Sequence, residues 1–212
     1  MTVLRICFLG DSITAGTGDD TYLGWPGRLC AAERARGHDL TNYNLGIRAD
    51  TSSMIAKRWR AECEVRLPAE FPAALVFAFG INDTAEEPAG LRVNPEESAR
   101  VARAILGEAA KWKPTLMIGP TPIDESKMPI RVGPVPRDIR NARIATASRI
   151  LEGIAAEVGV PYLDLYSSLA EDAEFRKSLA AGDGVHPTAD GYSVMAARIG
   201  AWSGWRRWLD KK

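Results

Sequence analysis

The sequence has few of the residues that build metal centres or disulfide frameworks. Its 212 residues include three cysteines and two histidines. Cys7, Cys30 and Cys63 are odd in number, and no two of them form a Cys-x-x-Cys pair. Neither a disulfide framework nor a zinc site is therefore expected.

Long hydrophobic runs and an excess of one charge are also missing. No apolar stretch approaches the ~20 residues that cross a bilayer, so no membrane span is expected. Lys and Arg number 27, as do Asp and Glu, and this balance gives no basic footprint for nucleic acid as a partner. The amino-terminal segment does not have the pattern of a secretory signal, which favours a cytoplasmic location.

Short apolar runs alternate with stretches of helical periodicity, and residues 1–212 are expected to form one domain. Strands are expected at residues 3–9, 40–45, 74–79, 115–119 and 161–165. Helices are expected at residues 25–36, 52–64, 95–112, 139–158 and 189–209. The alternation predicts an α/β fold, namely a flavodoxin-like three-layer α/β/α sandwich with a five-stranded parallel sheet.

The first apolar run ends in a Gly-Asp-Ser-Ile turn that carries Ser12. Ser12 is therefore expected just past the carboxyl end of a buried strand. In open α/β sheets ligands bind at this edge, because strand ends and helix N-termini converge there. A serine hydroxyl that attacks a carbonyl needs an imidazole to accept its proton.

His186 has the setting of such a base. It lies three residues after Asp183, and Gly184 permits a tight turn between them, so the Asp183 carboxylate can reach the ring. A carboxylate on one ring nitrogen fixes the tautomer and leaves the other nitrogen free to accept the serine proton. His38 lies in a connection between an expected helix and the next strand, and no catalytic role is expected for it.

Two other strands are expected to end at the same edge with polar groups. The strand at 74–79 is followed by Asn82, and the strand at 40–45 is followed by Gly46. An acyl-transfer transition state develops negative charge on the former carbonyl oxygen, which needs donors fixed in advance. The Asn82 amide and the Gly46 N–H would serve as such donors.

These segments resemble the four blocks of the SGNH/GDSL hydrolase family, which is named for its Ser, Gly, Asn and His. The matching motifs are Gly-Asp-Ser-Ile at 10–13, Asn-Leu-Gly at 44–46, Gly-Ile-Asn-Asp at 80–83 and Asp-Gly-Val-His-Pro at 183–187. They occur in the family's order and extend over nearly the whole chain.

The resemblance implies a serine esterase or acylhydrolase that cleaves carboxylic esters through an acyl-enzyme. It implies that Ser12 is the nucleophile, His186 the base and Asp183 the residue that orients it. The oxyanion hole would consist of the Ser12 N–H, the Gly46 N–H and the Asn82 side chain. All of these are protein groups, so no metal or organic cofactor is implied, and the expected partner is a small-molecule ester.

One departure from the family and several alternatives remain. Family members often carry a second glycine soon after the one matched by Gly46, whereas this chain has Arg48-Ala49, so the loop path is expected to differ. A short acyl group is expected, because the sequence shows no long apolar channel. Acyl transfer, carbohydrate deacetylation and a non-catalytic flavodoxin-like ligand-binding module stay open, and the oligomeric state is not indicated.

Two segments are candidate walls of the site. The proline-rich segment 119–136 follows an expected strand at the same edge, and it is interpreted either as a wall of the binding site or as a rigid surface excursion. Segment 86–95, after Asn82, is a second candidate wall.

Other residues are interpreted as structural. Asp11 and Asp83 are expected to hold local turns through bonds to backbone N–H groups. Trp202, Trp205 and Trp208 recur at three-residue steps and are expected to form a core-facing stripe on one helix.

Overall fold

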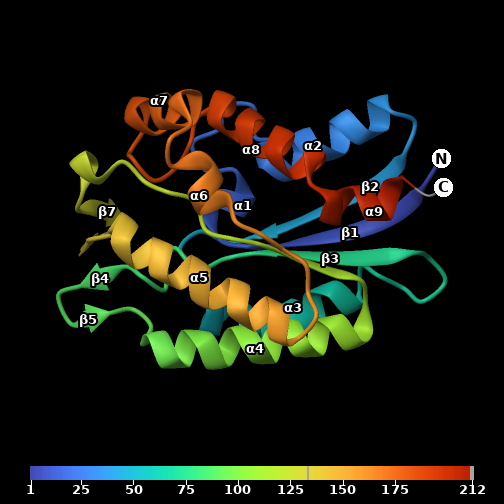
Figure 1. Cartoon of the computed structure of the whole chain (residues 1–212), viewed down its shortest axis with the longest axis horizontal. Coiled ribbons are helices and arrows are strands. Elements are labelled where there is room, and N and C mark those ends of the chain that lie inside the picture. The colour runs from blue at the N-terminus through green and yellow to red at the C-terminus, as the bar shows by residue number, and fades with distance from the viewer. Residues whose placement is uncertain (133, 211–212) are drawn as a thin grey trace.

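A five-stranded parallel sheet lies between two layers of helices (Figure 1). The computed structural model describes residues 1–132 and 134–210, and Gly133 of the proline-rich segment lies outside the described residues. The strands of the sheet are β1 (Val3–Gly10), β2 (Asp39–Gly46), β3 (Ala73–Ala78), β6 (Thr115–Ile118) and β9 (Tyr162–Leu163). Their spatial order is β2-β1-β3-β6-β9, which is the flavodoxin-like order. The predicted fold class is confirmed.

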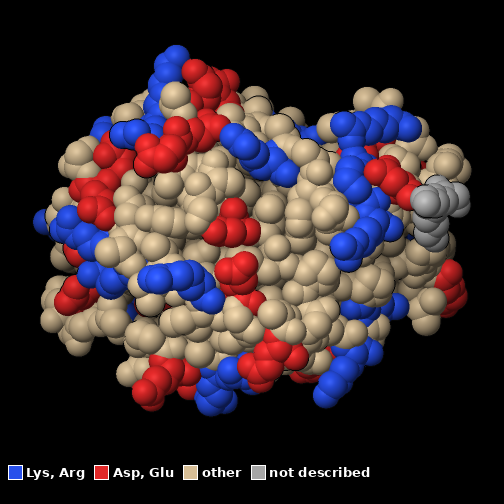
Figure 2. All heavy atoms as spheres, in the orientation of Figure 1, with Lys and Arg blue, Asp and Glu red and all other residues tan. Residues whose placement is uncertain are grey.

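Nine helices are assigned within the described residues. They are α1 (Ser12–Ala15), α2 (Gly24–Ala35), α3 (Ser52–Glu64), α4 (Pro95–Trp112), α5 (Asn141–Glu157), α6 (Leu165–Leu169), α7 (Ala173–Ala181), α8 (Ala189–Ala201) and α9 (Ser203–Leu209). No helix in this part of the chain is long and apolar enough to cross a membrane. On the face shown in Figure 2, basic and acidic side chains are interspersed, as the equal numbers of the two kinds suggest.

The alternation of side chains along β1 builds two cores. Ile6 and Phe8 face the layer that contains α2, α8 and α9, whereas Cys7 and Leu9 face the layer that contains α3, α4 and α5. All four side chains have no exposed surface. β1 is therefore buried on both faces, which is why its sequence is a nearly continuous apolar run.

The last predicted helix is in fact two helices. α8 ends at Ala201, Trp202 is extended, and α9 starts at Ser203. The Trp202 ring covers Gly204 so closely that a Cβ there would lie 2.4 Å from a ring carbon. Trp205 is fully buried, and Trp202 and Trp208 pack beside the same core. The three tryptophans thus face the core as expected, but across a break in the helix.

The two candidate wall segments fold into hairpins that meet each other. Segment 86–95 contains β4 (Glu86–Glu87) and β5 (Gly90–Leu91). The proline-rich segment contains the 3-10 turn η1 (Glu125–Lys127), β7 (Ile130–Val132) and the first two residues of β8 (Val135–Arg137). The backbones of Glu86 and Asp138 exchange hydrogen bonds of 2.8 and 2.9 Å. The hairpins therefore support each other beyond the carboxyl ends of the sheet strands.

Candidate active site

Ser12 is the first residue of α1, directly after β1. Asp11 caps this helix, because its carboxylate accepts a hydrogen bond from the Ile13 N–H at 2.9 Å. The N–H groups in the first turn of a helix have no intrahelical acceptor, so the Ser12 N–H is available to a ligand. Ser12 is 6% exposed, and the fold holds its hydroxyl at the sheet edge where ligands bind in this architecture.

Ser12, His186 and Asp183 form a chain of hydrogen bonds. The His186 Nε2 atom lies 2.8 Å from the Ser12 Oγ atom, and His186 Nδ1 lies 2.6 Å from Asp183 Oδ2. The other Asp183 oxygen accepts hydrogen bonds from the N–H groups of Val185 and His186, both at 2.9 Å. Gly184 has a φ of +87°, which glycine adopts readily and which closes the turn.

The Asp183 carboxylate is strongly stabilised in its ionised form. Partial burial alone would raise its pKa, but the hydrogen bonds from the His186 ring and backbone outweigh burial and hold the pKa of Asp183 below its ordinary value. Asp183 is therefore ionised at neutral pH and can orient the imidazole. The sequence spacing of three residues predicted this contact.

The Asn82 side chain is held from both ends. Its Nδ2 atom donates to Asp11 Oδ2 at 3.1 Å, and its Oδ1 atom accepts from Arg92 Nη1 at 3.2 Å. An amide nitrogen carries two hydrogens, so one N–H of Asn82 remains after the bond to Asp11. Burial raises the pKa of Asp11 to about 6, although the Ile13 N–H and the nearby His186 favour its ionised form.

Gly46 does not line the cavity beside Ser12. Its N–H donates to Asn44 Oδ1 at 3.0 Å. A Cβ on Gly46 would lie 2.2 Å from the Ala15 nitrogen of α1 and 2.7 Å from the Asp11 carbonyl oxygen. The geometry therefore assigns Gly46 to the close packing of α1 on β2 and gives no support to its expected role as an oxyanion donor.

Ala49 lies in the loop after Gly46, whose path was expected from the sequence to differ from that of family members. It lines the cavity beside Ser12 and has a φ of +67°, a left-handed conformation that is uncommon for residues other than glycine. Its carbonyl oxygen accepts from Arg92 Nη2 at 2.9 Å. Among residues 1–132 and 134–210, no hydrogen-bond acceptor contacts the Ala49 N–H. The Arg48-Ala49 departure from the family pattern indicated the unusual loop at Ala49. No pattern in the sequence indicated the contacts of Arg92.

The cavity beside Ser12 is small, with a volume of about 30 Å³. Its walls include Ser12, Arg48, Ala49, Asn82, His186 and, from the β7–β8 hairpin, Ile130 and Arg137. The proline-rich segment is therefore a wall of this cavity. Segment 86–95 supports that wall, because Glu87 pairs with Arg137 at 2.8 Å.

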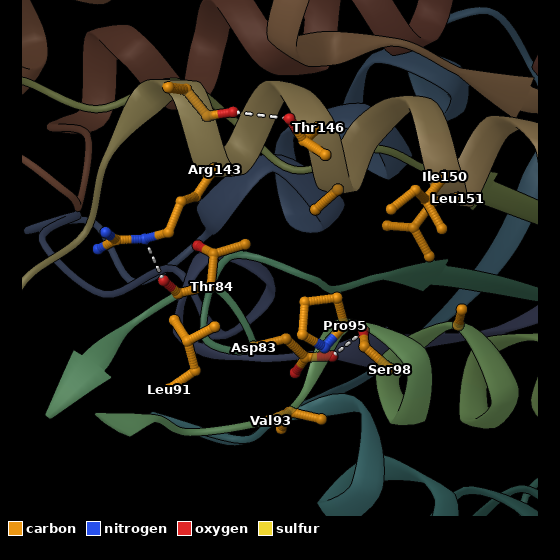
Figure 3. Close-up of a pocket in the computed structure, with 13 residues that line it drawn as sticks. Asp83, Thr84, Leu91, Val93, Pro95, Ser98, Arg143, Thr146, Ile150 and Leu151 are labelled. Carbon is orange, nitrogen blue, oxygen red and sulfur yellow. Dashed lines mark hydrogen bonds between the residues drawn. The ribbon is translucent and has the colours of Figure 1, made fainter. Parts of the chain in front are cut away.

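A larger cavity of about 260 Å³ lies between α4 and α5, with the β4–β5 hairpin at one end (Figure 3). Its walls are mainly apolar, and none of its residues also lines the cavity beside Ser12. Asp83, at its edge, accepts hydrogen bonds from the Ser52 N–H at 2.8 Å and from the Ser98 hydroxyl at 2.5 Å. Asp83 thus joins its turn to α3 and α4 and does not cap a local turn.

His38 precedes β2, at the opposite end of the sheet from Ser12. Its Nδ1 atom accepts a hydrogen bond from the Thr2 N–H at 3.3 Å. The three cysteines are free and buried. Within the described part of the chain, no group of three or more His, Cys, Asp or Glu side chains could hold a metal ion.

Comparison with known proteins gives a consistent picture of the fold and family. Residues 8–194 match the GDSL-like Lipase/Acylhydrolase family. The chain is 30% identical over 185 residues to the esterase TesA of Pseudomonas aeruginosa, covering 84% of this chain and 77% of the relative.

Solved structures share the fold. A lipase/acylhydrolase from Enterococcus faecalis superposes with a TM-score of 0.75 at 23% identity, with 97% of both chains covered. The psychrotrophic esterase EstA from Pseudoalteromonas sp. has a TM-score of 0.70 at 18% identity, covering 98% of this chain and 99% of that one. The family match extends over most of the chain, and this chain belongs to the GDSL-like lipase/acylhydrolase family of esterase- and lipase-like hydrolases.

Proposed function

We propose that this protein is a serine esterase that cleaves carboxylic esters of short acyl groups through a Ser12–His186–Asp183 triad. The observation that carries this proposal is the chain of two hydrogen bonds, 2.8 Å from Ser12 to His186 and 2.6 Å from His186 to Asp183. These are the contacts that activate a serine hydroxyl and orient its base. Its relative in Pseudomonas aeruginosa is named an esterase, which agrees with this activity.

In the proposed reaction, the Ser12 Oγ atom bonds to the ester carbonyl carbon while His186 Nε2 accepts the hydroxyl proton. The tetrahedral intermediate collapses, the bond to the leaving alcohol breaks, and His186 returns the proton to the alcohol oxygen. Water then attacks the acyl-enzyme in the same way, with His186 again as base and acid. The products are a carboxylic acid and an alcohol, and Ser12 is regenerated.

The proposed oxyanion hole uses the Ser12 N–H, the remaining N–H of Asn82 and the Ala49 N–H, which takes the place expected for Gly46. Removing one such donor typically costs about 2.7–4 kcal/mol of transition-state stabilisation. Arg92 contacts both the Asn82 amide and the Ala49 carbonyl, so it is proposed to position two of the three donors. Fixed donors stabilise the developing charge without reorganisation during the reaction.

The preference for a short acyl group follows from the size of the cavity beside Ser12. Its volume of about 30 Å³ is a few times what one water needs by the same measure, so the space directly beside Ser12 is narrow. The larger apolar cavity of Figure 3 shares no lining residue with it. The larger cavity is therefore lined separately and is not a direct extension of the space beside Ser12.

The test is hydrolysis of nitrophenyl acetate, butyrate and octanoate by the wild-type protein and by Ser12→Ala. We expect the variant to lose at least about a thousandfold in kcat, as removal of a triad nucleophile does. A fluorophosphonate probe should label the wild-type protein and not the variant. Ser167→Ala, at an exposed position on α6, is the matched control and should behave as wild type.

Different results would contradict the nucleophile, the enzymatic activity and the short-acyl preference. Equal turnover by wild type and Ser12→Ala would show that Ser12 is not the nucleophile, and absence of both turnover and labelling would favour a binding module. Faster hydrolysis of the octanoate than of the butyrate would contradict the short-acyl preference alone.

A further inference from the structure

The cavity beside Ser12 has a cationic wall. Arg48 and Arg137 both line it, and among the described residues no Asp or Glu side chain does. The proposed reaction at the ester bond uses only uncharged oxyanion donors, so it does not require either guanidinium group. We therefore consider a role for these two charges in binding another part of the substrate.

The positive charge of Arg137 is incompletely balanced by its neighbours. Glu87 pairs with Arg137 Nε at 2.8 Å and with Arg92 Nε at 3.2 Å, so one carboxylate serves two guanidinium groups. The other partners of Arg92 are the neutral oxygens of Asn82 and Ala49. Burial lowers the pKa of Arg92, and the like charge of Arg137 lowers it further.

The other carboxylates of this region are engaged elsewhere. Asp50 pairs with Arg58 at 2.8 Å, and Asp83 accepts from Ser52 and Ser98. Asp183 accepts from the His186 ring. Asp50 and Asp83 act on Arg92 through their charge, but within the described residues none of these three carboxylates pairs with Arg48 or Arg137.

Arg137 also has an unused donor. Its side chain is 12% exposed, and its Nη1 atom is buried without any hydrogen-bond partner within residues 1–132 and 134–210. A buried donor of this kind is unfavourable until an acceptor reaches it. Guanidinium groups bind carboxylates and phosphates through two parallel N–H donors, which gives both strength and orientation.

We propose that the ester substrate carries a carboxylate near its scissile bond, and that Arg137 binds this carboxylate with Arg48 beside it. The inference rests on the proposed esterase function and specifies its substrate class. A hydrogen bond to a charged group contributes enough binding free energy to change a rate by roughly 10-fold to 100-fold when it is lost.

The test compares esters that differ only in this charge. In the pair 4-acetoxybenzoate and methyl 4-acetoxybenzoate, the first carries its charge in the leaving group. In the pair 4-nitrophenyl hydrogen adipate and 4-nitrophenyl methyl adipate, the first carries its charge in the acyl group. We expect the wild-type kcat/KM to favour the anionic member of at least one pair by about 10-fold or more. The two pairs distinguish which half of the substrate carries the anion.

Variants then locate the source of the preference. Arg137→Met should lose most of the preference, because the rate for the anionic ester should fall more than the rate for the neutral ester, and Arg137→Lys should keep part of the preference. Arg131→Met removes a positive charge from the same hairpin at a residue that does not line the cavity, and it should keep the preference. If Arg137→Met fails to fold, the exposed Arg48→Met should still reduce the preference.

The outcomes separate this inference from the function on which it rests. Ser12-dependent hydrolysis at equal rates for both members of both pairs would overturn the anionic substrate class and leave the esterase standing. An anion preference that survives in both Arg137→Met and Arg48→Met would overturn the assignment to these arginines. Absence of Ser12-dependent hydrolysis of all four esters would overturn the proposed function and this inference together.

Discussion

Asp11 links the two parts of the proposed catalytic machinery through one buried carboxylate. One of its oxygens caps α1, which carries Ser12, and the other accepts from Asn82. The residue is 1% exposed, and burial raises its pKa to about 6. Ionisation of Asp11 therefore opposes folding, although both of its hydrogen bonds use the carboxylate as acceptor.

Replacement of Asp11 by Asn is expected to change how stability depends on pH. The folded carboxyl keeps its proton up to about pH 6, whereas the ordinary pKa is 3.8, so the folded state binds more protons between these values. Stability of the wild type must then fall as pH rises through this window. Asn does not titrate, so the stability of Asp11→Asn relative to the wild type should rise by roughly 2 kcal/mol between pH 4 and pH 7.

Urea unfolding of both proteins at several pH values measures this difference, since the contributions of groups that do not interact with Asp11 cancel. Asp20→Asn, at an exposed position, should run parallel to the wild type. Parallel curves for Asp11→Asn as well would mean that Asp11 ionises as readily in the folded protein as in the unfolded one.

Residues whose geometry is local could be predicted from the sequence. The spacing of Asp183 and His186 determines their contact, and Asn82 follows a strand that the apolar pattern identifies. Arg92 could not be predicted, because its contacts with Asn82 and Ala49 depend on the path of the β4–β5 hairpin. The same limit explains Gly46, since its packing against α1 requires a helix of four residues that no periodicity reveals.

At the scale of elements, the approach of α1 to β2 decides where Ser12 lies. Gly46→Ala would add a Cβ 2.2 Å from the Ala15 nitrogen and 2.7 Å from the Asp11 oxygen. Both are backbone atoms and cannot yield without moving α1. We expect a loss of stability of about 1–3 kcal/mol, together with a fall in kcat/KM because the Ser12 hydroxyl moves relative to His186.

Gly153→Ala is the matched control for this substitution. Gly153 is an exposed interior residue of α5, and a Cβ there has no neighbour within 4 Å. Alanine favours the helix by roughly 1 kcal/mol over glycine, so this variant should be more stable and equally active. Urea unfolding and ester hydrolysis of both variants test the contrast, and unchanged stability and activity in Gly46→Ala would contradict the packing role.

Long periodic elements could also be predicted, whereas their interruptions could not. The helices at 52–64 and 95–112 have the predicted bounds, because each carries an extended apolar face. The break between α8 and α9 occurs where the Trp202 ring packs on Gly204 and beside the core. The packing beside the core is a tertiary contact, and it leaves the periodicity of the sequence intact. The two hairpins have strands of two or three residues, which are too short for an alternating pattern to be recognised.

At the scale of the whole molecule, residues far apart in the sequence are joined by a buried ion pair. Glu33 of α2 is 1% exposed and accepts hydrogen bonds from Arg206 of α9 at 2.8 and 2.9 Å. Trp205 donates to the same carboxylate at 3.3 Å. Burial would raise the pKa of Glu33, but the bonds from Arg206 and Trp205 outweigh it and lower the pKa. The ionised carboxylate thus depends on α9.

Removal of Arg206 should therefore lower the free energy of unfolding by more than the net contribution of the ion pair. Arg206→Met leaves a buried carboxylate without its main partner, and the expected loss is about 3–5 kcal/mol. Because the folded pKa of Glu33 is lowered, ionised Glu33 stabilises the folded protein above its unfolded pKa of 4.5, and this stabilisation disappears as pH falls. The destabilisation caused by Arg206→Met should therefore be largest near pH 7 and smaller in acid. Glu33→Gln/Arg206→Met should be more stable than Arg206→Met alone, since it has no buried carboxylate left with only the exposed Arg36 and the Trp205 N–H as close partners.

A double-mutant cycle by urea unfolding at pH 7 and pH 4 measures this coupling. Arg103→Met is the control, because Arg103 pairs with Glu157 at 2.9 Å while both side chains are about half exposed. Such a surface pair contributes little to stability, so its removal should have little effect at either pH. If Arg206→Met and the double variant were equally destabilised at pH 7, Glu33 would not require Arg206, and α9 would be held to α2 by the burial of Trp205 and Leu209 alone.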